Sequence, residues 1–169
     1  MKGGDVLILV RDGINFTTPA QSPVLPIDNT TEWCAVRIFT RSPQSSSQPP
    51  SHLDVYNIYR PPIRTNESDE RVDHFDPAAF PSSNRALIIG DINAHHPSWD
   101  VTCLDPDEVG RGVHDWAQAA GWSVLNTGEP TRVGYGEGTR HTAPDVALAH
   151  RDLAPRCTWS TGADLGSDH

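Results

Sequence analysis

The stretch Leu87-Ile88-Ile89-Gly90-Asp91-Ile92-Asn93 guides the interpretation of this chain, because an apolar strand runs directly into two polar side chains. Alternation along an extended backbone places Asp91 and Asn93 on the same side. A carboxylate beside a carboxamide at a strand end can activate and orient a water molecule. Both residue types also favour turns. This stretch alone therefore leaves a turn and a hydrolytic site equally open.

The rest of the chain predicts many short strands and one good helix. The helix is expected over 109–120, where apolar residues recur at helical spacing and Gly121 stands at the C′ position. One helical turn is expected near 76–80. Alternating or continuous apolar runs predict strands at 6–10 (a buried strand), 32–40, 53–59, 86–89, 122–125, 145–149 and 157–159. This pattern indicates an α+β or four-layer α/β protein with mostly antiparallel sheets.

Length and composition predict a single domain. A chain of 169 residues is long enough for one core and too short for two ordinary domains. Its 15 prolines and 13 glycines favour turns and short elements. Residues 41–51 and 63–84 are polar and irregular and are expected to be flexible loops. No repeat or second domain is evident.

The charge and the cysteines narrow the classes of function. A formal net charge of −9 disfavours a protein that coats nucleic acid. It leaves a nuclease possible, since a metal site built from carboxylates is acidic. Cys34, Cys103 and Cys157 have neither zinc spacing nor a disulfide pattern. The run at 6–10 is too short for a signal peptide or a membrane span. We expect a soluble intracellular protein without a membrane partner.

Three further segments carry residues suited to chemistry. Ser167-Asp168-His169 offers an oxygen ligand for a metal ion and an imidazole, although such a tripeptide is more often a polar tail. Asp145 opens an apolar strand, either as a turn residue or as a carboxylate that orients a histidine. Tyr59 ends a strand that Arg60-Pro61-Pro62 terminates, and most such tyrosines pack against the protein.

In this order, the four segments resemble endonuclease/exonuclease/phosphatase domains. The pattern is a tyrosine at a strand end, Gly-Asp-x-Asn, Pro-Asp opening a strand, and Ser-Asp-His. The longer stretch from Gly90 to Trp99, with Tyr59-Arg60-Pro61-Pro62 before it and 164–169 after it, is similar to endonucleases of non-LTR retrotransposons. The resemblance extends from about Gly3 to His169. It implies a four-layer α/β/β/α sandwich of the DNase I-like type.

The resemblance also implies roles for individual residues. Asp91 would polarise or deprotonate the attacking water, and Asn93 would orient that water or bind the scissile phosphate. Asp168 would be a ligand of a divalent cation, Mg²⁺ or Mn²⁺. His169 would contact the phosphate, with Asp145 fixing its tautomer. Either Asp91 or His169 would be the general base.

Two further residues are expected to bind substrate. Tyr59 would donate a hydrogen bond to the phosphate, and Thr131, before Arg132-Val133, resembles a threonine near the family's site. The implied reaction is nicking of DNA to leave a 3′-hydroxyl. In a retrotransposon that end primes a reverse transcriptase, expected as a domain of a longer parent polyprotein. Action on genomic DNA would require a nuclear location.

The chain also departs from the family pattern. We find neither the opening strand with a catalytic Asn nor the following strand with a metal-binding Glu. Glu32 belongs to a segment that matches a later structural strand. The family continues beyond Ser-Asp-His into one more strand. The expectation is therefore an incomplete domain without its N-terminal strands and its final strand. Two alternatives stay open: a catalytically dead retroelement fragment, or a relative that acts on another phosphoester.

The remaining conspicuous side chains have simpler interpretations. His95 and His96 are expected to be loop residues more often than metal ligands, because adjacent side chains point apart. Trp116 and Trp122 are expected in the core. Trp99 is expected to pack against the loop of Asp91 and Asn93, with contact to nucleic acid as the alternative.

Overall fold

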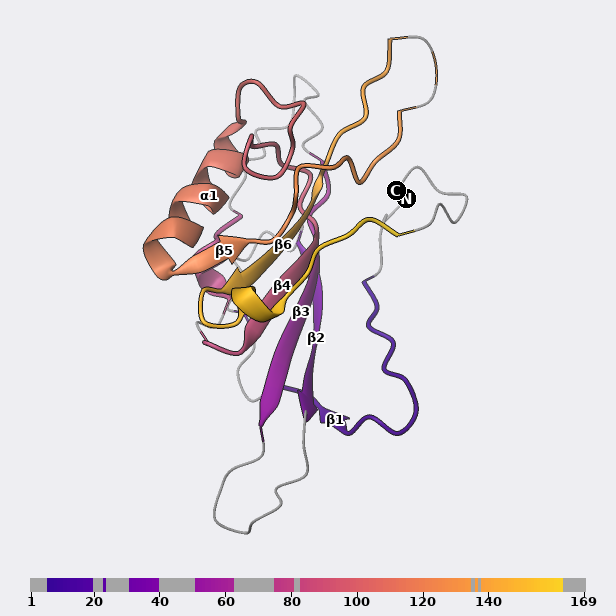
Figure 1. Cartoon of the computed structure of the whole chain (residues 1–169), viewed down its shortest axis with the longest axis vertical. Helices are drawn as coiled ribbons and strands as arrows, with labels where there is room; N and C mark the ends of the chain where they lie inside the picture. Colours follow the sequence, from indigo (N-terminus) through magenta and orange to yellow (C-terminus); the bar gives the residue numbers. More distant parts are fainter. Residues whose placement is uncertain are drawn as a thin grey trace.

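One mixed β-sheet organises the fold (Figure 1). The computed structural model describes residues 6–19, 23, 31–39, 51–62, 75–80, 83–134, 136 and 138–162. The strands within these ranges are β1 (Phe16–Thr17), β2 (Glu32–Phe39), β3 (His52–Tyr59), β4 (Ala86–Asp91), β5 (Trp122–Val124) and β6 (Asp145–His150). Their order across the sheet is β1-β2-β3-β4-β6-β5. The β3–β4 pair is parallel, and every other pair of neighbouring strands in this order is antiparallel.

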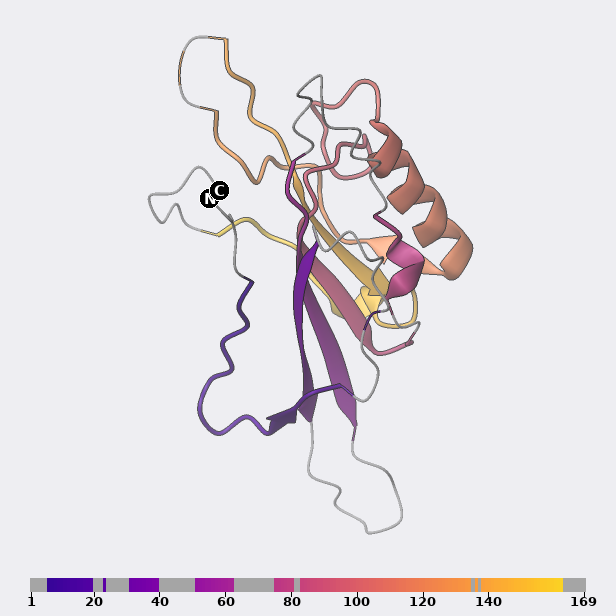
Figure 2. The same cartoon turned by 180° about the vertical axis from the view of Figure 1, so that it is seen from behind.

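Helix α1 (Glu108–Ala120) covers one face of the sheet together with the short 3-10 helix η1 (Pro77–Ala79) (Figure 2). The N-cap residue of α1 is Asp107, whose side chain accepts a hydrogen bond from the Gly110 amide at 2.6 Å. The helix ends at Gly121, which has a left-handed backbone with φ 74°. Local capping therefore fixes both ends of α1.

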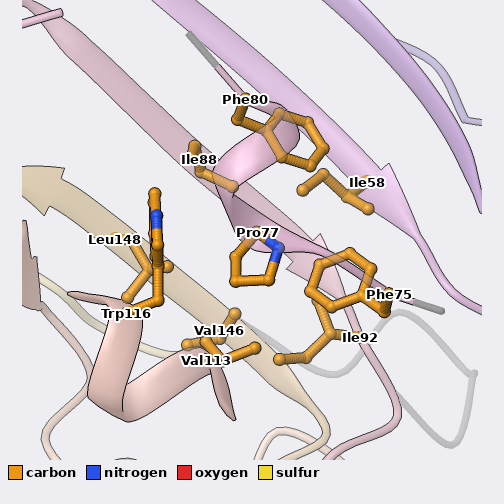
Figure 3. Close-up of a pocket in the computed structure, with 10 residues that line it drawn as sticks. All are labelled: Ile58, Phe75, Pro77, Phe80, Ile88, Ile92, Val113, Trp116, Val146 and Leu148. Atoms are coloured by element: carbon orange, nitrogen blue, oxygen red, sulfur yellow. The ribbon is translucent and has the colours of Figure 1, made fainter. Parts of the chain in front are cut away.

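The apolar core lies between the sheet and α1. Figure 3 shows side chains from β3, β4 and β6 converging with residues of α1 and η1 on a small apolar pocket. Its lining includes Ile58, Ile88 and Val146 from the sheet and Val113 and Trp116 from the helix. Because side chains alternate along a strand, the odd-numbered residues of these three strands project from the opposite face. We call that opposite face the site face.

Two irregular segments lie on the side of the site face, 6–15 and 157–162 (Figure 2). The side chain of Asn57 on β3 donates a hydrogen bond to the carbonyl of Leu7 at 3.2 Å. The prediction of a buried strand at 6–10 is wrong: the segment is irregular, and Leu7 and Leu9 are 68% and 85% exposed. A strand needs an unpaired neighbouring backbone, and β3 is already paired with both β2 and β4.

The strand predicted at 157–159 is also wrong, because the chain there is irregular after the short helix η2 (Ala154–Arg156). The helix prediction is confirmed and begins one residue earlier, at Glu108. The strands predicted at 32–40, 53–59, 86–89, 122–125 and 145–149 are confirmed as β2, β3, β4, β5 and β6, with small shifts of their ends.

The α+β class and the predominance of antiparallel pairing are confirmed. The ranges with assigned structure account for one helical layer and one sheet layer of the expected sandwich. Of the two expected loops, 41–50 and most of 63–84 lie outside the described residues, and η1 occupies the turn expected near 76–80. Within the part of the chain that the structure describes, no helix is long and apolar enough to cross a membrane.

Candidate active site

Three predicted site residues form a row across neighbouring strands. Tyr59 at the end of β3 is paired with Asp91 at the end of β4. Asp91 is in turn paired with Asp145 at the start of β6. Residues opposite one another in a sheet project from the same face, here the site face. The topology therefore brings together side chains that are 86 positions apart at the extremes, from Tyr59 to Asp145.

Asn93 lies in a tight turn directly after this row. Its backbone has a positive φ of 44°, the left-handed conformation that asparagine tolerates better than most residues. The Asn93 amide donates a hydrogen bond to Asp91 Oδ1 at 2.8 Å, and its side-chain Nδ2 donates to the carbonyl of Arg60 at 2.8 Å. The turn and the row are therefore held in one fixed geometry.

Arg60 supports this turn from the neighbouring strand. It is only 3% exposed, and its Nη1 donates to the carbonyls of Ile92 and Asn93 at 2.8 and 3.0 Å. Its backbone amide donates to the carbonyl of Asp91 at 2.8 Å. The sequence indicated Arg60 only as the end of a strand. Its supporting role depends on the parallel pairing of β3 with β4, for which the local pattern gave no signal.

Thr131 and Asn126 hold the start of β6. The Thr131 hydroxyl donates to Asp145 Oδ2 and accepts from the Asp145 amide at 3.4 Å. Asn126 Nδ2 donates to the carbonyl of Asp145 at 3.0 Å, and Asn126 Oδ1 accepts from the Ala147 amide at 2.8 Å. Thr131 thus lies against a carboxylate of the row. Asn126 was not singled out from the sequence, where nothing distinguishes it from an ordinary loop residue.

The structure therefore brings together five of the seven predicted site residues: Tyr59, Asp91, Asn93, Thr131 and Asp145. The other two, Asp168 and His169, lie outside the described residues.

The row places two carboxylates against each other. Side chains directly opposite on antiparallel strands have Cβ atoms about 4.5–5.5 Å apart, where like charges are destabilising. A divalent cation relieves such repulsion, and carboxylate oxygens are the ligands that Mg²⁺ prefers. Among the residues of known placement, no group of three or more His, Cys, Asp or Glu side chains is arranged to hold a metal ion. Mg²⁺ commonly uses one or two carboxylates with water and phosphate oxygens, so Asp91 and Asp145 fit part of such a ligand set.

The loop after Asn93 packs on the protein. Trp99 is fully buried, and its Nε1 donates to the Ala94 carbonyl at 3.1 Å, which confirms its predicted packing role. The His96 ring stacks on His114 of α1 with ring centroids 4.1 Å apart. Burial, and then the proximity of His114, lowers the pKa of His96. His95 Nδ1 lies 3.3 Å from a carboxylate oxygen of the buried Asp100.

The two tryptophans expected in the core also pack there. Trp122 is 3% exposed and stacks on the partly buried Trp116, with ring centroids 5.5 Å apart.

Comparison with known proteins agrees with the motif order. The sequence profile of the family described as "Endonuclease-reverse transcriptase" matches residues 53–169, the part of the chain that contains every predicted site residue. The chain belongs to this family. Over 96 residues it is 33% identical to a protein of Drosophila melanogaster named "Probable RNA-directed DNA polymerase from transposon BS". That similarity covers 57% of this chain and 10% of the Drosophila protein.

A solved structure of another protein has a similar fold. It is the "Endonuclease domain of TRAS1, a telomere-specific non-LTR retrotransposon", with a TM-score of 0.61 and 20% sequence identity. The similarity covers 93% of this chain and 64% of that structure. This likeness confirms the DNase I-like fold class. Together with the family match, it confirms the resemblance to endonuclease domains of non-LTR retrotransposons.

Proposed function

We propose that this chain is a divalent-metal-dependent phosphodiesterase domain that nicks DNA. The observation that carries the proposal is the row of Tyr59, Asp91 and Asp145 on the site face, with Asn93 fixed directly beside it. Phosphodiester hydrolysis needs an in-line nucleophile and stabilisation of charge on the non-bridging oxygens. A carboxylate, a carboxamide and a phenol at one edge of a sheet supply groups for both tasks.

Asp91 and Asn93 are assigned to the attacking water. One oxygen of Asp91 accepts a hydrogen bond from the Asn93 amide, which orients the carboxylate. Asp91 then polarises or deprotonates the water as a general base. The Asn93 side chain is held through Nδ2 by Arg60, and an amide group has a second N–H and an oxygen as well. Those atoms orient the water or bind the scissile phosphate.

Asp145 and Tyr59 are assigned to the phosphate side of the reaction. The Thr131 hydroxyl fixes one oxygen of Asp145. In this proposal Asp145 orients the His169 imidazole, which contacts the phosphate and serves as the alternative general base. The Tyr59 hydroxyl donates a hydrogen bond to a non-bridging oxygen. Thr131 lies close enough to Asp145 to position it and, in this proposal, also lines the substrate site.

The proposed cofactor is Mg²⁺ or Mn²⁺, with Asp168 as a ligand and a carboxylate of the row beside it. When bound, the cation stabilises negative charge on the phosphate in the transition state. The in-register placement of Asp91 and Asp145 supports a cation at this edge, because carboxylate oxygens are the ligands that Mg²⁺ prefers.

The proposed context is a retrotransposon polyprotein. The Drosophila relative is named as an RNA-directed DNA polymerase, and the matched region spans 10% of it. A nick with a free 3′-hydroxyl is the primer that such a polymerase extends. We therefore propose DNA as the substrate, a reverse transcriptase domain as the partner in the parent polypeptide, and the nucleus as the place of action.

A substrate screen tests the choice of DNA over other phosphoesters. The net charge of −9 is the observation that favours the alternative, because acidic proteins bind DNA poorly. Purified chain is incubated in Mg²⁺ or Mn²⁺ with supercoiled plasmid, and separately with a nucleotide and a phosphoinositide. Nicked plasmid without phosphate release from the small molecules supports the proposal. Phosphate release from a small molecule with intact plasmid would favour the alternative.

A catalytically dead fragment gives a third pattern in the same screen. It would process no substrate with or without metal, although its heat unfolding can still be cooperative. Cleavage that stops when EDTA removes the metal excludes this outcome. Cleavage that persists in EDTA contradicts the proposed metal dependence.

A further inference from the structure

Asp100 is a buried carboxylate beside the candidate site, with a side chain only 1% exposed. A buried charge is costly unless hydrogen bonds compensate it. Asp100 Oδ1 accepts from the Thr102 amide at 2.9 Å and from the Thr102 hydroxyl at 2.6 Å. Its Oδ2 accepts from the Ala143 amide at 3.1 Å and lies 3.3 Å from His95 Nδ1. Four donors therefore converge on one carboxylate.

These donors come from the two segments that bracket the site. His95 follows Asn93 by two residues, and Ala143 precedes Asp145 by two residues. The Ile92 amide also donates to the carbonyl of Pro144 at 3.1 Å, so the two segments meet at a second point. The Asp100 carboxylate thus spans from the loop beyond β4 to the chain entering β6.

We propose that Asp100 is a positioning residue, whose carboxylate couples the loop carrying Asn93 to the segment that enters β6 at Asp145. The inference rests on the proposed phosphodiesterase function. Movement at either end would change the relation of the water-orienting amide to the carboxylate row. Reaction rates are sensitive to misplacements of this kind even when binding is preserved.

The chemistry of the pocket requires a carboxylate. A carboxylate is an acceptor only, whereas an amide of the same shape presents two N–H donors. Burial raises the pKa of Asp100, but the hydrogen bonds from Thr102, the Ala143 amide and His95 outweigh it and hold the pKa below its ordinary value. The ionised form accepts a hydrogen bond from the N–H at His95 Nδ1, which leaves the lone pair of the neutral ring on Nε2. Asp100 therefore also selects a tautomer of His95, whose side chain is 40% exposed.

The test compares Asp100→Asn with Asp105→Asn. The Asp105 side chain is 91% exposed, so its variant controls for loss of one charge in the same loop. Plasmid nicking in Mg²⁺ is measured well below the melting midpoint of each variant. We expect kcat to fall about tenfold or more in Asp100→Asn with KM within about threefold. Asp105→Asn should keep both parameters. A role in stability alone would lower the melting midpoint and leave kcat unchanged.

A second measurement does not depend on activity. The amide proton and nitrogen resonances of Asn93 and Asp145 are compared among wild type, Asp100→Asn and Asp105→Asn. We expect the amide resonances of both Asn93 and Asp145 to shift in Asp100→Asn, and those of neither residue to shift in Asp105→Asn. If Asp100→Asn does not fold, Thr102→Val removes one donor at 2.6 Å, and the amide resonances of Asn93 and Asp145 should both shift relative to wild type.

The kinetic and resonance measurements distinguish failure of the positioning role from failure of the proposed function. If wild type nicks DNA and Asp100→Asn keeps its kcat, the positioning role is overturned. If wild type does not nick DNA, the proposed function fails. The resonance shifts then test whether Asp100 couples the loop carrying Asn93 to the segment that enters β6. Shifts at both Asn93 and Asp145 then support the coupling, and a shift at one or neither overturns it.

Discussion

Asp91 and Asp145 occupy directly opposite positions on the antiparallel strands β4 and β6, and both belong to the site face. Like charges directly across a sheet repel, so this pairing needs a group of opposite charge to offset it. Natural sequences retain such conflicts mainly where function requires them. The pair is therefore consistent with the proposal that this edge of the sheet binds a cation or substrate.

Asp91→Asn should stabilise the metal-free chain while removing its activity. Asparagine retains an oxygen for the Asn93 amide, which Asp91 Oδ1 accepts at 2.8 Å. It also removes one of the two facing charges, worth about 0.2–1 kcal/mol. We expect the melting midpoint in EDTA to rise by up to about 4 °C. The gain should shrink when saturating Mg²⁺ is added, since the cation stabilises the wild-type pair. A midpoint that falls in EDTA would contradict the repulsion.

Thr131 should be replaceable by serine and not by valine. Its hydroxyl donates to Asp145 Oδ2, and hydrogen bonds to charged groups contribute about 1.5–3 kcal/mol. Thr131→Val keeps the shape and loses the donor, so kcat for plasmid nicking should fall by about tenfold or more. Thr131→Ser keeps the donor and should stay within about threefold of wild type. Equal activity of the two variants would exclude a role for the hydroxyl.

Replacement by alanine should lower the free energy of unfolding at Gly90 and raise it at Gly112. A Cβ on Gly90 would lie 1.9 Å from the carbonyl oxygen of Ile58, and φ is +139°. Gly90→Ala should therefore cost about 2–5 kcal/mol through strain and overpacking. Gly112 lies exposed on α1 with no atom within 4 Å of its Cβ position. Gly112→Ala should stabilise by about 0.5–1 kcal/mol. Urea unfolding measures both, and a stable Gly90→Ala would show that the strand arrangement at this position is wrong.

His96 should make stability dependent on pH. Burial, and then the nearby His114, lowers its pKa from the ordinary 6.5, while Asp115 partly opposes this and Arg111 and Asp107 act more weakly. The folded state therefore disfavours the proton, so this contribution to stability is full above about pH 6.5 and is lost as the pH falls toward the folded pKa. Its Nδ1 accepts from the Ser98 amide at 3.0 Å, which also requires the neutral ring.

The measurement is the melting midpoint at about pH 7.5 and pH 5.5 for wild type and His96→Phe. The loss on acidification should be smaller in His96→Phe, which has a ring for the stack on His114 and no titrating group. The exposed His141→Gln is the control and should retain the wild-type loss. An equal loss in wild type and His96→Phe would assign the pH dependence to other groups.

Local sequence predicted the parts of the fold that local physics determines. The apolar run before Gly90 gave β4, and the glycine after Ala120 gave the end of α1. For Asp91 and Asn93 the turn interpretation is confirmed, while the hydrolytic site stays a prediction with which this turn geometry is compatible. The row with Tyr59 and Asp145 came only through family resemblance, because pairing between distant strands leaves no periodic signal.

The wrong strand prediction at 6–10 and the failure to recognise Arg60 and Asp100 also arise from contacts between distant segments. The run at 6–10 has the composition of a buried strand, but composition does not reveal whether a neighbouring strand edge is available for pairing. Arg60 and Asp100 are ionisable residues, a type usually exposed, and each is buried because backbone donors or acceptors from distant segments surround it. Those partners exist only once the sheet has formed, so sequence reasoning missed both residues.

The most direct test of the account is conversion of supercoiled plasmid to open circles by the purified chain in Mg²⁺, compared with Asp91→Asn and Asp105→Asn. The account predicts nicking by wild type and Asp105→Asn, loss of nicking on addition of EDTA, and a fall of about a hundredfold or more in Asp91→Asn. A polymerase should extend the nicked ends, because they carry 3′-hydroxyls. Nicking by folded Asp91→Asn at the wild-type rate would contradict the account.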